Sequence, residues 1–204
     1  MRKLFLYGMM ALVASAANGE IADRIAAVVD GQVITVSEIS QMVDLQFFTT
    51  TDRREVLDNL IAQALRYRDV ERFGAQDISK DTIEARLRVI QARFASPAAF
   101  DTALAHAELT LDEFRALIKR QLQVEAYVQE RFSPLIFVSS DEIDQYYRGA
   151  YTKQRQERGL PVPRLSEVRE EIRTTLKSAS LEKEIDTWTT QLRGHANVDI
   201  YAWR

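Results

Sequence analysis

The sequence contains no cysteine, and this absence excludes disulfide bonds, thiolate metal ligands and a cysteine nucleophile. It has only two histidines, His106 and His195, and neither is accompanied by further residues at metal-ligand spacing. Each lies near the end of a predicted helix, where a partly positive imidazole is favoured without any metal. We therefore expect no metal site.

The motifs that hold nucleotides or activate a nucleophile are also missing. Gly31 belongs to a predicted turn, and no helix with a glycine-rich phosphate-binding pattern follows it. No serine stands in a nucleophile-elbow context. The carboxylates of Asp141, Glu142 and Asp144 fall in the first turn of a predicted helix, where acidic residues are favoured for structural reasons. We therefore predict no cofactor, no catalytic residue and no enzymatic activity.

An excess of basic residues is absent as well. The chain has 27 Lys and Arg against 30 Asp and Glu, so its formal net charge is −3. A nucleic-acid partner needs a basic stripe to bind phosphates, and this balance argues against one. The content of 46% hydrophobic and 28% charged residues is typical of a folded globular protein.

The apolar run at the N-terminus, residues 4–13, is too short for a membrane-spanning helix, which needs about 20 apolar residues. Basic residues precede this run and small residues follow it, namely Arg2, Lys3 and Ala14-Ser15-Ala16-Ala17. This pattern is typical of a signal peptide over residues 1–16, cleaved after Ala16 or Ala17. A buried N-terminal helix or an uncleaved anchor remains the alternative. Cleavage leaves enough chain for one or at most two domains, without stable membrane insertion.

Two β-branched runs, residues 25–29 and 32–36, flank the dipeptide Asp30-Gly31. An Asp-Gly pair between such runs is a strong hairpin signal, because a type I′ turn needs positive φ at both central residues. Two strands alone are marginal in water, so a third is expected. The comparable segment is residues 197–203, and we predict that the C-terminus returns to pair with the hairpin.

Helical periodicity and capping residues cover most of the chain between these ends. The spacing predicts helices over residues 37–48, 52–73, 79–94, 96–107, 110–132, 139–147 and 166–194. Each range begins at its predicted N-cap, and those at Asp52, Thr110 and Ser139 have a glutamate three residues later, as in a capping box. The polar, then Pro- and Gly-containing stretch 152–163 indicates a connector before the last helix. The predicted fold class is mainly α (α+β), a helical core with a small antiparallel sheet formed by the N-terminal hairpin and the C-terminal strand.

Several segments together resemble the SurA family of periplasmic chaperones. They occur in the family's order, and they are residues 22–39, 57–65, 73–79, 111–122, 139–143 and 181–201. The resemblance implies a helical chaperone domain over residues 17–150. It also implies a linker over residues 151–163 and a C-terminal helix and strand, residues 164–204, that pack back on the first domain.

One departure from the family concerns the parvulin-type prolyl isomerase domains usually inserted after the helix at 139–147. Here only 15 residues, 148–162, separate Tyr147 from Pro163, whereas domains typically need 50 residues or more. The resemblance therefore implies a periplasmic, ATP-independent chaperone without the isomerase domain. Its partners would be unfolded or partly folded polypeptides, outer-membrane proteins in particular.

Client-binding residues are predicted at two apolar clusters. Phe94 and Phe100 lie at a corner between two predicted helices. Tyr127 and Phe132 belong to a second cluster, with Leu135, Ile136 and Phe137, around a helix break at Pro134. Adaptable apolar surface is what a chaperone needs, although ordinary helix–helix core is the alternative and is favoured for both clusters. Two other functions remain open: an accessory protein related to peptidyl-prolyl isomerases, and a dedicated adaptor for one exported partner.

Overall fold

The computed structural model describes residues 23–202, so the predicted signal peptide lies outside the described residues. The described part is mainly helical with one small sheet, as predicted. Its elements in chain order are β1 (Ile25–Val29), β2 (Gln32–Thr35), α1 (Val36–Asp44), α2 (Arg53–Phe73), α3 (Lys80–Gln91), α4 (Pro97–His106), α5 (Leu111–Arg131), η1 (Ser133–Leu135), α6 (Ser140–Tyr146), the π-helical turn η2 (Tyr147–Tyr151), α7 (Thr152–Glu157), α8 (Leu165–His195) and β3 (Val198–Ile200).

The sheet confirms the predicted return of the C-terminus. Its strand order is β2-β1-β3, and both pairings are antiparallel. Asp30 and Gly31 have φ values of 48° and 90°, the positive values that the hairpin turn requires. The main-chain N–H of Asp30 donates to the carbonyl of Asn197 at 2.8 Å, and the Asn197 N–H donates to the Asp30 carboxylate at 2.8 Å. The turn therefore also fixes the last strand.

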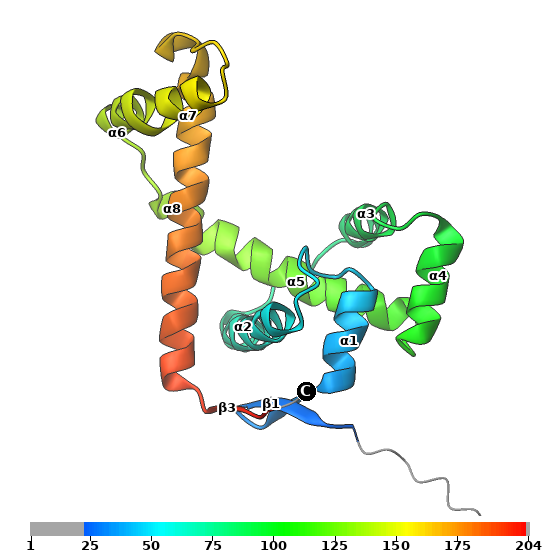
Figure 1. Ribbon diagram of the computed structural model, residues 1–204. Coiled ribbons are helices and arrows are strands. Elements are labelled where there is room, and N and C mark those ends of the chain that lie inside the picture. The colour runs from blue at the N-terminus through cyan, green and yellow to red at the C-terminus, as the bar shows by residue number, and fades with distance from the viewer. Residues whose placement is uncertain (1–22, 203–204) are drawn as a thin grey trace, which may run out of the picture.

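Helices α1 to α5 pack over this sheet and form what we call the body (Figure 1). Its core is fully buried, with Ile39, Ile61, Phe100, Phe114 and Ile118 each at most 1% exposed. The predicted caps are confirmed at four of the helix starts in the body. Asp52, Ser79, Ser96 and Thr110 each accept a backbone N–H from the first turn that follows.

The prediction for α1 was wrong at both ends. Its N-cap is Thr35, whose hydroxyl accepts the N–H of Glu38, while the hydroxyl of Ser37 donates to the Asp23 carboxylate. The helix ends at Asp44 rather than near Phe48, because Gln46 takes a left-handed conformation with φ of 49°. The chain then turns Phe47 into the core, where it is 4% exposed.

Helix α8 spans 31 residues, about 46 Å, and connects two parts of the molecule (Figure 1). It begins after Arg164 rather than with Ser166 as cap, and it ends at His195, one residue beyond the predicted Gly194. Its C-terminal half packs on α2 and α5 through Trp188. Its N-terminal half packs on α6 and η2, and residues 138–176 form what we call the outer lobe.

The first half of the predicted connector is helical. Residues 152–157 form α7, which continues from α6 through the π-helical turn η2. The polar composition indicated a loop, but Tyr151 is buried and stacks on Tyr147 with 6.0 Å between ring centroids, which keeps the helix against the lobe. Only residues 158–164 are extended or turning, and Arg155 donates to the carbonyl of Pro161 across them. The domain division itself stays a prediction.

Candidate functional site

Two of the four predicted client-binding residues, Phe100 and Phe132, are buried, and the other two, Phe94 and Tyr127, are partly buried against the same cores. Phe100 is 1% exposed and contacts Phe94 edge-on, with ring centroids 5.4 Å apart. Tyr127 and Phe132 pack on Trp188 at centroid distances of 5.5 and 5.4 Å. Their position is that of helix–helix core, the alternative that the sequence left open, and client binding through them stays a prediction.

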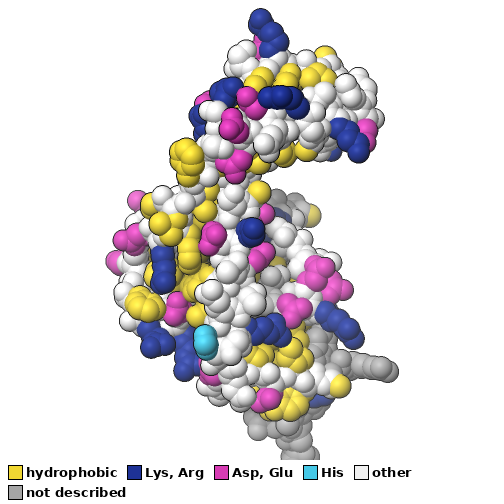
Figure 2. Space-filling model, turned by 90° about the vertical axis from the view of Figure 1, so that its left-hand side faces the viewer, with side chains coloured by type: hydrophobic (Ala, Val, Ile, Leu, Met, Phe, Trp, Pro, Cys, Tyr) yellow, Lys and Arg dark blue, Asp and Glu magenta, His cyan; other side chains and the backbone are white. Residues whose placement is uncertain are grey.

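The two most exposed large apolar side chains among residues 23–202 lie instead just after the end of α5. Leu135 is 73% exposed and Phe137 is 82% exposed, and both belong to residues 133–137, which we call the neck because they join the body to the outer lobe. Figure 2 shows apolar side chains gathered on this face around the joint between the two parts, with the lobe overhanging a hollow. Sequence reasoning placed Leu135 and Phe137 in a predicted cluster but did not select them. The sequence feature that could have indicated them is Pro134. A proline ends the helix, and the residues that follow it no longer belong to a helix face that packs on the core.

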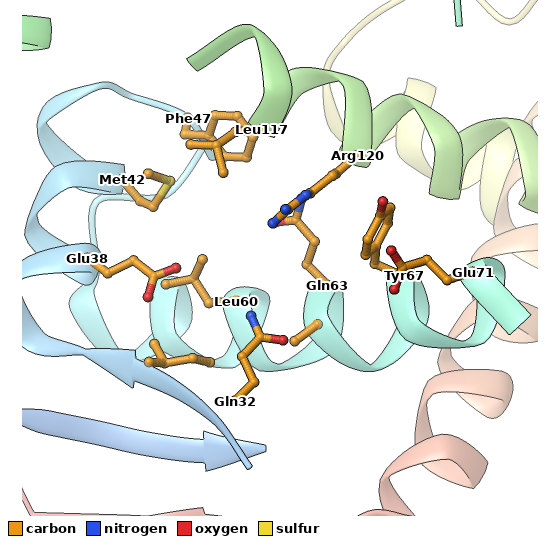
Figure 3. A pocket seen from close by; sticks show the side chains of 12 residues that line it. Gln32, Glu38, Met42, Phe47, Leu60, Gln63, Tyr67, Glu71, Leu117 and Arg120 are labelled. Atoms are coloured by element: carbon orange, nitrogen blue, oxygen red, sulfur yellow. The ribbon is translucent and has the colours of Figure 1, made fainter. Parts of the chain in front are cut away.

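A groove opens between β2, α1, α2 and α5, with a volume of about 310 Å³ (Figure 3). Half of its lining side chains are apolar, and we call these the floor; the other half are polar, and we call these the walls. The floor side chains are Ile34, Met42, Phe47, Leu60, Ala64 and Leu117, and the wall side chains are Gln32, Glu38, Gln63, Tyr67, Glu71 and Arg120. The groove was not predicted, because its lining comes from four elements that meet only in the folded chain.

Glu38 and Arg120 face the groove from different sides (Figure 3). Burial raises the pKa of the Glu38 carboxyl. The Asp23 carboxylate raises this pKa further, whereas a hydrogen bond with the Thr35 backbone and the charge of Arg120 lower it. The Arg120 guanidinium lies over the Tyr67 ring, 5.4 Å from its centroid. Burial, and next the Glu71 carboxylate, raise the pKa of the Tyr67 hydroxyl. Among residues 23–202 none of Glu38, Glu71 and Arg120 forms a salt bridge, so the groove lining presents two carboxylates and one guanidinium.

The stretch 23–202 contains no group of three or more acidic or histidine side chains placed to hold a metal ion. Within the same stretch, no helix combines the length and the apolar character needed to cross a membrane. The fold and these surfaces define a mainly helical protein with apolar sites suited to binding another polypeptide.

The comparisons with known proteins agree with this class. No protein-family model matches the chain. The chain is 29% identical over 140 residues to the Chaperone SurA of Saccharophagus degradans, which covers 63% of this chain and 32% of that protein. It is 27% identical over 148 residues to the Chaperone SurA of Pseudomonas fluorescens, covering 67% and 34%. The chain therefore spans about a third of the length of the curated relatives it matches.

A solved structure supports the fold. It is one of two SurA-like chaperones of Campylobacter jejuni, the virulence factor PEB4 and the periplasmic protein Cj1289, and it matches with a TM-score of 0.53 at 15% identity. The match covers 89% of this chain and 100% of that one. The resemblance expected from the sequence is thus confirmed: the chain is SurA-like, and no parvulin-sized insertion separates α6 from α8.

Proposed function

We propose that the protein is an ATP-independent chaperone of the periplasm that holds unfolded polypeptides, outer-membrane proteins among them, without prolyl isomerase chemistry. The observation that carries the proposal is the exposure of Leu135 and Phe137 at the neck, beside the overhang of the outer lobe. The likeness to SurA chaperones supports it, and the description of Cj1289 as periplasmic supports the location.

The neck suits reversible holding. An unfolded client offers apolar side chains of any sequence, and burying a Leu or Phe side chain stabilises a complex by roughly 1.5–3 kcal/mol. Two exposed side chains therefore give a weak contact that a client leaves as it folds, so release needs no nucleotide. Charged side chains surround the joint and keep this apolar surface soluble (Figure 2).

The test is suppression of aggregation by residues 17–204 when an unfolded outer-membrane protein is diluted from denaturant without nucleotide. We expect dose-dependent suppression near equimolar ratios. Replacing Leu135 and Phe137 by serine removes the exposed apolar contacts, and we expect it to weaken suppression several-fold without lowering the melting temperature. A matched control is Val89→Ser, because Val89 is 57% exposed on α3, away from the neck. Absence of suppression by the folded wild-type protein would overturn the proposal.

A further inference from the structure

We propose that the groove between β2, α1, α2 and α5 binds an extended segment of unfolded polypeptide through its main chain, with one apolar side chain of that segment on the floor. This inference rests on the proposed chaperone function and names a second contact site, separate from the neck. Its occupant is a peptide strand rather than a folded element or a small ion.

The size of the groove matches a single side chain with its flanking main chain. About 310 Å³ lies at the lower end of the range for ligand pockets, which is too little for a helix. Met42 and Leu117 lie on the floor beside Phe47. An unbranched thioether adapts to side chains of different shape, so the floor favours apolar residues without selecting one.

The polar walls match the main chain of an extended peptide. Such a peptide presents N–H donors and C=O acceptors along both of its edges. Glu38 supplies an acceptor on one side of the groove and Arg120 supplies donors on another, while the amides of Gln32 and Gln63 can do either (Figure 3). A main chain carries this alternation in every sequence, as a general chaperone requires.

The charges on the walls also argue against an ionic occupant. An anionic ligand would meet Glu38 and Glu71, and a cationic ligand would meet Arg120, within the same small groove. A neutral, dipolar peptide group is attracted by both. Glu38 is partly buried and forms no salt bridge within residues 23–202, so an incoming N–H would supply a hydrogen bond to a carboxylate that is poorly solvated.

The experiment uses a decapeptide with blocked ends, a single phenylalanine and otherwise serine and threonine, titrated into isotope-labelled protein and followed by amide chemical shifts. We expect saturable shifts at Gln32, Glu38 and Gln63. A second peptide has the same side chains but N-methylated amides around the phenylalanine, which removes its donors. We expect this peptide to bind at least tenfold more weakly.

Two variants probe the groove itself. Arg120→Met keeps the aliphatic stem but removes the guanidinium, and Ala64→Leu fills part of the floor; each is expected to weaken peptide binding about tenfold. Arg88→Met, an exposed position on α3, is the matched control and should bind as the wild type does. Equal binding of the two peptides, or unchanged binding by both variants, would overturn the inference. The wild-type aggregation assay tests the chaperone function independently, so the two failures are distinguishable.

Discussion

The body and the outer lobe are built from the same kinds of helix but bury very different cores. The body core contains 21 buried apolar side chains, whereas the lobe core contains five: Val138, Ile143, Tyr151, Val168 and Ile172. A cluster of five is far below what an independent domain needs. The lobe therefore depends on α8, which supplies two of the five, and on polar contacts such as the hydrogen bond from the Tyr147 hydroxyl to the Pro163 carbonyl at 2.8 Å.

Helix α8 serves the two regions with separate segments. Ile172 is buried in the lobe and Trp188 is buried against the body, but residues 177–180 between them contain no buried side chain. The helix backbone and the neck are what join the two cores. Apolar side chains stay exposed at the neck because neither core extends far enough to cover them. The small size of the lobe core is therefore one reason why the neck is available as the proposed binding surface.

Truncation after Arg164 removes α8, which packs on both the body and the lobe, so we expect it to have the largest effect on stability. The truncated chain loses β3, which pairs with β1, and Trp188, whose indole N–H donates to the Asp69 carboxylate at 3.1 Å. It also exposes Val70, Val124, Val128 and Phe132 on the body. We expect an unfolded or aggregating product, measured by circular dichroism and size-exclusion chromatography. A soluble product that melts cooperatively would mean that the body is stable without α8.

The local signals of the sequence were sufficient for much of this arrangement. The Asp30-Gly31 turn, the capping boxes at Thr110 and Ser139 and the pairing of the last strand were all predicted from short segments. These features depend on neighbouring residues or on a simple need for a third strand. The hairpin turn also positions β2, which supplies Gln32 and Ile34 to the groove.

The features that were predicted wrongly or were not predicted depend on tertiary contacts. The helical form of residues 152–157 follows from the burial of Tyr151 in the lobe, which polar composition cannot reveal. Phe100 and Phe132 have the same apolar character as Phe137, yet only the structure separates the buried pair from the exposed one. Likewise, Glu38 and Arg120 are 82 residues apart in the chain and share a groove only after folding.

A matched pair of substitutions sharpens the comparison between the two cores. Ile118 in the body and Ile143 in the lobe are both 0% exposed and both helical. Ile118→Ala should lower the free energy of unfolding by roughly 2–5 kcal/mol and lower the main melting transition. Ile143→Ala should mainly speed hydrogen exchange over residues 138–176, with a smaller shift of that transition, because the lobe opens locally.

The two variants are compared by thermal melting and by hydrogen exchange with mass spectrometry. Equal shifts of the main transition would contradict the difference between the regions and would make body and lobe one cooperative unit.

The smallest expected effect concerns two glutamates with opposite pKa shifts. Burial raises the pKa of Glu38 in the body above its ordinary value of 4.5, whereas hydrogen bonds from the Ser139 backbone and hydroxyl lower the pKa of Glu142 in the lobe. A raised folded-state pKa means that ionisation costs stability as the pH rises through 4.5 and above. Glu38→Gln should therefore raise the melting temperature at neutral pH and lose this gain below pH 4.5.

Glu142→Gln should act with the opposite sign, because a carboxylate with a lowered pKa stabilises the fold above its ordinary value and loses this contribution as the pH falls. At neutral pH, Glu142→Gln should speed hydrogen exchange at the start of α6. In acid, where Glu142 is protonated in the wild type as well, the difference from the wild type should disappear. Melting and exchange measured at both pH values check the pair. A neutral-pH loss of stability in Glu38→Gln would show that the carboxylate already has a favourable partner in the groove, and it would remove the reason to expect a client N–H there.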